Sequence, residues 1–294
     1  MKMLLLPGVL LASAAASGCF VSVDSQGQIV KDEKRFTVKG VPDITLSTFD
    51  GSVELQPSDR QEVVVEIEKR GPTREAVDAL EVISTQDGNR IQVEVKRPRT
   101  ENYGIGFHRS ASARLIVSLP RRSNVVARTG DGSIRLEGLQ GRLELRTGDG
   151  SIRAANVSGD LRLHTGDGSV TVDGAEGTLD IDTGDGGVNV TGKLTAVKMH
   201  TGDGSIVYRA EAGTVMTDAW DISTGDGGVS LFLPANFGAE LDARTGDGSI
   251  SNDLDVSGDN DSRERRRSLR GRLGAGGKLL RIRTGDGAIR LRES

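Results

Sequence analysis

The tetrapeptide Thr-Gly-Asp-Gly recurs throughout the 294 residues of this chain. Its copies begin at Thr129, Thr147, Thr165, Thr183, Thr201, Thr224, Thr245 and Thr284. The first five copies are 18 residues apart, and the later intervals are 23, 21 and 39 residues. A fixed short period indicates a stacked repeat protein, because each unit can bury its apolar face only against its neighbours.

Each 18-residue unit divides into two nonapeptides, such as TGDGSIRAA (147–155) and NVSGDLRLH (156–164). Glycine stands at the fourth place, and aliphatic residues stand at the sixth and usually at the eighth. This alternation predicts a short strand with one buried face. The sequence therefore predicts an all-β, single-stranded parallel β-solenoid with about 18 residues per coil. Roughly a dozen coils spaced about 4.8 Å apart would form a body about 55 Å long.

Parallel stacking predicts internal ladders of aliphatic side chains, which suit a chain with only 3% aromatic residues. We expect the ladders to contain Leu143, Leu145, Ile152, Leu161, Leu163, Val170, Val172, Leu179, Ile181, Val188 and Val190. The residues between them, such as Glu144, Arg162 and Asp180, alternate in charge. They indicate a solvated outer face.

The period weakens toward both ends of the chain. Two weaker copies of the motif precede residue 129, at Thr48 and Thr85, and the wide intervals are interpreted as coils without the motif. Residues Thr73 to Leu80 predict a short helix that covers the open end of the solenoid, with Thr73 as its N-cap. The last segment, KLLRIRTGDGAIRL, is expected to close the stack.

These patterns predict the organisation of the whole chain. The expected parts are a signal peptide at 1–18, a lipidated tether at 19–34, an N-terminal cap with irregular coils at 35–128, and regular coils at 129–294 that contain a charged loop at 253–277.

The amino terminus predicts export. Lys2 is followed by an apolar stretch that is too short to span a bilayer, and then by Ala16-Ser17-Gly18-Cys19. Small residues before a cysteine resemble a bacterial lipobox, in which the cysteine is acylated, although such motifs usually have leucine where Ala16 stands. We expect lipidation at Cys19 and attachment to a membrane through that lipid. The alternative is an ordinary secreted protein with a chance cysteine. One thiol excludes an internal disulfide.

The repeated aspartates could form a cation site or serve one structural turn. They are Asp131, Asp149, Asp167, Asp185, Asp203, Asp226, Asp247 and Asp286. Calcium-binding β-roll repeats place the ligand aspartate at the sixth place of the nonapeptide, whereas here it stands at the third. Calcium also needs six to eight oxygens, and one carboxylate per coil supplies too few unless neighbouring coils share them. A calcium-stabilised β-roll stays an alternative.

The turn interpretation needs no ligand. Glycine on both sides of the aspartate permits positive φ, and the threonine and aspartate side chains can accept bonds from backbone N–H groups. Stacked carboxylates about 5 Å apart repel by only about 1 kcal/mol per neighbour in water. The outward arginines Arg128 and Arg146 could offset that repulsion.

Enzymatic interpretations find little support in the residue pattern. Carbohydrate-cleaving β-helices bind one substrate through non-repeating residues that line a groove, which a row of identical aspartates does not provide. His108, His164 and His200 are interpreted as surface residues, and motifs for a serine nucleophile, a zinc protease or a phosphate loop are absent from the sequence. A six-residue acyltransferase repeat also fails, because stepping by six from Ile152 reaches Ser158 and His164. No cofactor is expected.

Charge limits the partners. The chain has 38 basic and 42 acidic residues, which argues against nucleic acid as a partner. Arginines gather at 263–272, and we interpret this segment as a solvated insertion. The alternative is contact with anionic glycan or lipid headgroups. The candidate residues are Arg265, Arg266, Arg267 and Arg270.

The lipobox, the helix-containing cap, the repeated TGDGSI coils and the terminal LLRIRTGDGAIRL resemble the bacterial "putative adhesin" β-strand-repeat family over about residues 35–294. The resemblance implies a right-handed parallel β-helix in the cell envelope, and it supplies no catalytic residues. We expect a non-enzymatic, lipid-anchored envelope protein that acts as an adhesin-like or scaffold module, with an envelope polysaccharide or another envelope protein as its partner. The alternative is a carbohydrate-binding or carbohydrate-cleaving β-helix.

Overall fold

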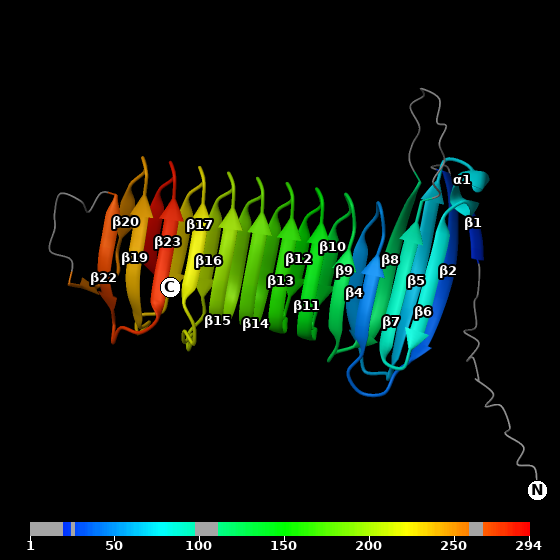
Figure 1. Cartoon of the computed structure of the whole chain (residues 1–294), viewed down its shortest axis with the longest axis horizontal. Helices are drawn as coiled ribbons and strands as arrows, with labels where there is room; N and C mark the ends of the chain where they lie inside the picture. The colour runs from blue at the N-terminus through cyan, green and yellow to red at the C-terminus, as the bar shows by residue number, and fades with distance from the viewer. Residues whose placement is uncertain (1–19, 25–26, 98–110, 259–266) are drawn as a thin grey trace, which may run out of the picture.

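A computed structural model describes residues 20–24, 27–97, 111–258 and 267–294. The described chain is an elongated all-β body in which the strands lie side by side along one axis (Figure 1). Its one described helix, α1 (Arg74–Asp78), lies at the N-terminal end.

The strands before residue 129 are β1 (Phe20–Asp24), β2 (Gly27–Thr37), β3 (Asp43–Ser47), β4 (Val53–Ser58), β5 (Glu62–Gly71), β6 (Glu81–Asp87), β7 (Arg90–Lys96), β8 (Ser112–Pro120) and β9 (Asn124–Arg128). The strands from 134 to 210 are β10 (Ile134–Glu137), β11 (Gln140–Thr147), β12 (Ile152–Ala155), β13 (Ser158–Thr165), β14 (Val170–Thr183), β15 (Val188–Thr201) and β16 (Ile206–Ala210). The remaining strands are β17 (Trp220–Thr224), β18 (Val229–Leu233), β19 (Ala239–Thr245), β20 (Ile250–Asn252), β21 (Val256–Ser257), β22 (Ser268–Leu273), β23 (Leu279–Thr284) and β24 (Ile289–Glu293).

The pairings arrange these strands in two facing sheets. From the N-terminal end, sheet I runs β6, β7, β3, β9, β11, β13, the second halves of β14 and β15, β17, β23, β19 and β22. Sheet II runs β1, β2, β5, β8, β4, β10, β12, the first halves of β14 and β15, β16, β18, β24 and β20. Because β14 and β15 continue from one sheet into the other, all strands are hydrogen-bonded into one system.

The middle of the molecule confirms the 18-residue period. Leu143 pairs with Leu161, and Leu161 pairs with Leu179, in parallel register. All eleven aliphatic residues expected in the internal ladders are buried, each at most 2% exposed. Each coil thus supplies one strand to each sheet, and the core lies between the two sheets.

The two ends differ from a simple parallel solenoid. At the N-terminal end, β1, β2, β5 and β8 pair antiparallel in sheet II, and β6 and β7 form an antiparallel hairpin in sheet I. At the other end, β22 runs antiparallel to β19. The fold is therefore all-β and solenoid-like, with a parallel centre, antiparallel strands at the N-terminal end of both sheets and an antiparallel strand at the C-terminal end of sheet I.

The sequence order suggested that the last coil closes the stack, but the structure places this coil inside it. β23 lies between β17 and β19, and β24 lies between β18 and β20 (Figure 1). The chain therefore builds the coil of β19 and β20 first and then returns to fill the layer before it. This return, rather than a coil that lacks the motif, explains the interval of 39 residues.

The N-terminal part contains a similar rearrangement. β3 and β4, which flank the copy of the motif at Thr48, pair with β9 and β10 across the intervening segment 59–123. The copy at Thr85 is not a coil corner, because β6 and β7 form a hairpin whose turn contains Gly88 at φ 59°. The two weaker copies of the motif, at Thr48 and Thr85, therefore form different kinds of turn.

The structure confirms one further expectation and corrects two others. The helix is confirmed, since the Thr73 hydroxyl accepts a bond from Ala76 N at 3.2 Å and Val77 is buried. The tether expected up to residue 34 is wrong for its described part, where β1 pairs with β2 and β2 pairs with β5. The loop expected at 253–277 contains β21 and β22, because pairing with β22 covers the free edge of β19.

Near the C-terminal end the core contains large aromatic residues among the aliphatic ones. Tyr208 and Trp220 are fully buried, and their rings lie 5.3 Å apart between centroids. Phe237 packs on the other side of Trp220 at 5.2 Å. Within the described ranges, no helix is long and apolar enough to cross a membrane.

Candidate functional site

The repeated tetrapeptides form one straight row of corners, which we call the corner ladder. Each corner follows a strand of sheet I and leads into a strand of sheet II, along the upper edge in Figure 1. In spatial order the aspartates of the ladder are Asp50, Asp131, Asp149, Asp167, Asp185, Asp203, Asp226, Asp286 and Asp247. The structure thus brings together all eight predicted aspartates and adds Asp50 to them.

Threonine holds each corner to the preceding coil. The hydroxyl of Thr165 donates toward Gly148 O and Gly150 O, at 3.2 and 2.9 Å, and accepts from Gly168 N at 3.2 Å. The same pattern recurs at Thr147, Thr201 and Thr284. These hydroxyls are buried and satisfied by backbone groups, so the threonines have a structural role.

In the eight Thr-Gly-Asp-Gly corners from Thr129 onward, the glycines allow close packing and have no positive φ, whereas the sequence interpretation had expected positive φ. In the weaker copy at Thr48, Gly51 does have a positive φ, of 131°. Gly148, Gly150 and Gly168 all lie outside the positive-φ region. A Cβ on Gly168 would overlap the carbonyl group of Gly150 in the coil below. Positive φ occurs instead at the opposite corner of the coil, for example at Gly159 (φ 116°) and Gly177 (φ 115°).

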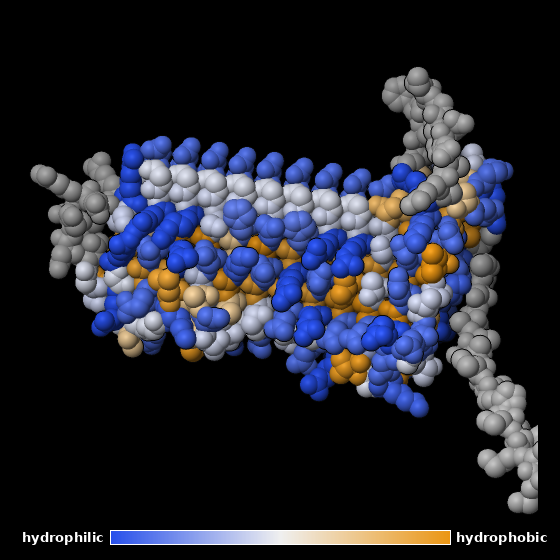
Figure 2. Space-filling view, viewed as in Figure 1, coloured by the Kyte–Doolittle hydropathy of each residue, from blue (hydrophilic) through white to orange (hydrophobic). Residues whose placement is uncertain are grey.

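The aspartate side chains of the ladder point into solvent. Figure 2 shows them as a regular row of hydrophilic groups above a band of near-neutral residues. In the described residues none of them accepts a hydrogen bond from a backbone N–H, contrary to expectation. Near the N-terminal end of the row, the charge of Asp50, together with desolvation and the charge of Asp149, raises the pKa of Asp131.

Arginine partners occur at the two ends of the row. Arg97 forms an ion pair with Asp50, and Arg267 lies 3.2 Å from Asp247. The sequence interpretation suggested that Arg128 and Arg146 offset the charge of the aspartate row, but neither side chain reaches it. Both bind Glu144 on the outer face of sheet I instead. Among the described residues, the seven aspartates between the two ends have no basic partner.

The geometry gives little support for a metal site in the corner ladder. Each coil supplies one carboxylate, and no group of three or more His, Cys, Asp or Glu in the described residues is arranged to hold a metal ion. A cation could therefore meet at most the carboxylates of adjacent coils, with water completing its ligands.

The outer face of sheet I carries two rows of polar residues that cross the strands. One row alternates strictly in charge: Arg270, Asp242, Arg281, Asp221, Lys198, Asp180, Arg162, Glu144. The other, next to the corner ladder, is Arg244, Arg283, Ser223, His200, Asp182, His164, Arg146, Arg128. The sequence interpretation found the alternating outward charges at Glu144, Arg162 and Asp180, which the structure confirms. It did not find how far the two rows extend, because their full length follows from the stacking order across the whole sheet.

The central residues of the second row resemble a nucleophile relay without forming one. His200 Nδ1 lies 3.0 Å from Ser223 Oγ, and His164 Nδ1 lies 3.2 Å from Asp182 Oδ2. These are two separate pairs, since the described contacts do not join His200 to Asp182. The histidines are on the surface, as predicted, and they lie on an open sheet face rather than in a groove.

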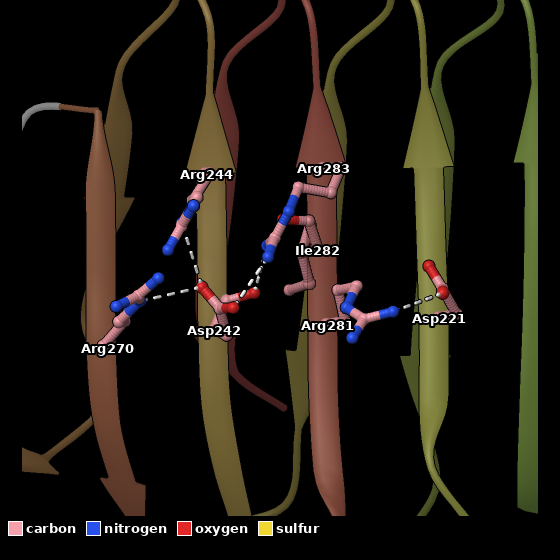
Figure 3. Close-up of polar contacts among 7 residues, drawn as sticks. All are labelled: Asp221, Asp242, Arg244, Arg270, Arg281, Ile282 and Arg283. Carbon is pink, nitrogen blue, oxygen red and sulfur yellow. Dashed lines mark hydrogen bonds and ion pairs between the residues drawn. The ribbon is translucent and has the colours of Figure 1, made fainter.

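The densest polar cluster of this face surrounds Asp242 (Figure 3). Arg283 Nη2 donates to Asp242 Oδ2 at 2.7 Å, and the Nε atoms of Arg270 and Arg244 each lie 3.3 Å from Oδ1. Partial burial acts to raise the pKa of Asp242, but the hydrogen bonds and charges of Arg283 and Arg270 hold it below its ordinary value.

Of the predicted anion-binding residues, Arg267 and Arg270 lie at this end of the face. Arg265 and Arg266 fall outside the described residues, as do Cys19 and His108.

One surface hollow lies at the N-terminal end of the corner ladder. It is lined by Ser47, Thr48, Phe49, Glu81, Glu94, Val95, Lys96 and Arg97. The Arg97 guanidinium lies 4.5 Å from the centre of the Phe49 ring, and Lys96 pairs with Glu94 at 3.2 Å. The aromatic and one of the acids in this hollow thus already have partners.

Fold and surface together define an elongated β-repeat protein built around one recurring Thr-Gly-Asp-Gly corner. The chain belongs to the Toastrack DUF4097 family, whose profile matches residues 41–292. The resemblance to bacterial "putative adhesin" proteins is thereby confirmed at the level of the family.

Solved structures with a similar course of the chain come from bacteria. A "putative adhesin" from Bacteroides fragilis NCTC 9343 is 13% identical, covers 89% of this chain and 96% of its own, and has a TM-score of 0.45. A "putative lipid binding protein" from Parabacteroides distasonis ATCC 8503 is 11% identical, with coverages of 89% and 96% and a TM-score of 0.44. No curated protein matches the chain. These distant likenesses transfer no function to it.

Proposed function

We propose that this protein is a non-enzymatic adhesin-like or scaffold module of the bacterial cell envelope. The supporting observation is the corner ladder: layer after layer presents the same corner in the same register, with its threonine buried and its aspartate exposed. An enzyme site needs a few residues held in a unique arrangement, whereas this surface offers many equal positions to an extended partner. Multivalent contact suits such a surface.

The proposal includes export and a lipid anchor. The apolar segment before Cys19 and the small residues around it support acylation of that cysteine, with the folded body displayed from the membrane surface. A right-handed winding of the coils is also part of the proposal, because connections between parallel neighbours in one sheet are almost always right-handed.

A carbohydrate-binding or carbohydrate-cleaving β-helix is the second candidate. The observation that favours it is the hollow with Phe49 and Glu81, where a sugar ring that displaces the Arg97 guanidinium from Phe49 would stack on an aromatic face beside a carboxylate. Replacing Phe49 by alanine would abolish saccharide binding under this alternative and leave it unchanged under the scaffold proposal.

The test is a binding screen with the soluble fragment 20–294 against purified envelope polysaccharides, peptidoglycan and envelope proteins. Saturable binding without turnover of the bound component supports the proposal. Release of reducing sugar, or failure to bind any envelope component, would overturn it.

The anchor is tested separately. Wild-type protein should fractionate with membranes when expressed in a bacterial host, and Cys19→Ser should shift it to the soluble exported fraction. Equal distribution of the two forms would exclude lipidation at Cys19.

A further inference from the structure

One end of sheet I is basic although the chain as a whole is acidic, with a net charge of −4. We call this surface, formed by the outward side chains of β17, β19, β22 and β23 with Arg267 and Asp247, the arginine face. Its charged residues are Arg244, Arg267, Arg270, Arg272, Arg281, Arg283, Asp221, Glu240, Asp242 and Asp247. Six guanidinium groups therefore face four carboxylates.

The pairing within this face leaves the excess charge at one place. Arg267, Arg272 and Arg281 each have one acidic partner, at 3.2 to 3.3 Å. The other three arginines share the single carboxylate of Asp242. Both unbalanced positive charges are thus concentrated around Asp242 (Figure 3).

Two of these three arginines still have donors to offer. Arg270 and Arg244 meet Asp242 through Nε, so their terminal Nη groups have no partner among the described residues. Their side chains are 59% and 44% exposed. Arg283 is more deeply placed and also donates to Asp242 O at 2.7 Å, which fixes the cluster to the strand. Asp242 thus occupies only the Nε donors of Arg270 and Arg244 and competes with an external anion for them, while their Nη donors stay free in the described part of the chain. Planar donor groups of this kind recognise carboxylate, phosphate or sulfate well.

The N-terminal half of the same sheet offers a matched comparison on β9 and β11. Arg128 and Arg146 also share one carboxylate, that of Glu144, and they are 49% and 55% exposed. There, however, the neighbouring outward charges leave no positive excess, since Arg128, Arg142, Arg146 and Arg162 stand against Asp43, Glu144, Asp160, Asp180 and Asp182. A pair of arginines on one acid is common to both places, whereas a positive excess occurs around Asp242 and not around Glu144.

We propose that the arginine face binds an acidic polysaccharide, with the Asp242 cluster as its main contact. This inference rests on the proposed envelope function and names its partner class. A membrane surface fits less well, because the arginine face offers lipid headgroups charge alone, and interfacial binding grows with the apolar area inserted besides charge. The exposed large hydrophobic residues of the described chain are Val41 and Val215, and neither belongs to the arginine face.

The test measures binding of the fragment 20–294 to heparin, to a carboxylated polysaccharide and to neutral dextran, at several salt concentrations. Wild-type protein should bind both acidic polymers and not dextran, and binding should weaken as salt rises. The double variant Arg244→Gln/Arg270→Gln should lose about tenfold or more in affinity. The matched control Arg128→Gln/Arg146→Gln should lose less than about threefold.

Asp242→Asn gives an independent readout, because it removes the internal competitor for the guanidinium groups. Binding should strengthen in this variant, which a merely structural cluster would not cause. Circular dichroism and the unfolding midpoint establish that each variant is folded.

Four results would overturn the inference: no binding to either acidic polymer, equal losses in the two double variants, weaker binding by a folded Asp242→Asn variant, or tighter binding to anionic phosphatidylglycerol vesicles than to the polymers. If the protein then binds another envelope component in the wider screen, the proposed function stands and only the partner class fails.

Discussion

A buried threonine hydroxyl that meets three backbone groups is what makes the Thr-Gly-Asp-Gly corner repeatable. Thr165 contacts two carbonyls of the coil below and one N–H of its own coil, so each added coil is fixed both to its predecessor and within itself. The aspartate contributes no comparable backbone bond. Its place at the tip of the corner instead keeps a charged group in solvent at every layer.

Close approach of the coils makes the last glycine of the motif indispensable. A Cβ on Gly186 would overlap Gly168 O, whereas a Cβ on the next residue, Gly187, would meet only Ser205 O at 3.7 Å. Gly186→Ala should therefore lower the free energy of unfolding by about 1–3 kcal/mol. Gly187→Ala should change it by less than about 0.5 kcal/mol. Urea unfolding followed by Trp220 fluorescence measures both, and equal effects would contradict the packing argument.

Carboxylate repulsion predicts a pH-dependent effect at Asp131. Its pKa in the folded state is raised, chiefly by the charge of Asp50. The repulsion therefore destabilises the fold above that pKa and is relieved as the pH falls through it. Asp131→Asn should raise the unfolding midpoint by about 1–3 °C at pH 7 and low salt. The gain should vanish near pH 3 and in high salt, and a gain that persists there would exclude repulsion as its cause.

At the scale of elements, the sequence predicts what each coil looks like but not the order in which coils stack. Alternation around Leu161 and Leu163 fixes which face is buried, and the period fixes the register of the central coils. The terminal coil has the same pattern as its neighbours, so it can pair equally well at the end of the stack or one layer inside it. The difference lies at the exposed edge, where β22 folds back antiparallel on β19 and leaves the inner place to β23.

Other differences between the sequence predictions and the structure have the same physical origin. The tetrapeptide at Thr85 reads like a corner, but strand pairing between β6 and β7 makes it a hairpin turn. The aspartate ladder could be predicted because every copy occupies one place in the repeat. The Asp242 cluster could not, because Asp242 and Arg283 are neighbours only through the inserted coil.

The coil of β23 and β24 lies between two other coils. We therefore expect removal of the C-terminal residues to disturb more than one layer. β23 and β24 separate two coils and supply Leu280, which pairs with Trp220. Deleting residues 279–294 should therefore expose the single tryptophan, shift its emission to longer wavelength and make it accessible to iodide. Retention of the native emission would show that the coil is not an internal layer.

At the scale of the whole molecule, the fold is a rod whose surface repeats along its length. Antiparallel strands cover the parallel centre at the N-terminal end of both sheets and at the C-terminal end of sheet I, which limits edge-to-edge aggregation there. The rod offers one acidic edge, formed by the aspartate row, and one basic end, the arginine face. An extended partner could contact both, which a compact site could not offer.

We propose that threonine and glycine hold the corner ladder together without a cation. The most direct test is thermal unfolding of the fragment 20–294 in EDTA and in millimolar calcium, followed by circular dichroism. Carboxylates that only touch solvent predict midpoints within about 3 °C of each other. A rise of tens of degrees with calcium, or unfolding by the chelator at room temperature, would contradict the account and make the aspartate row a metal site.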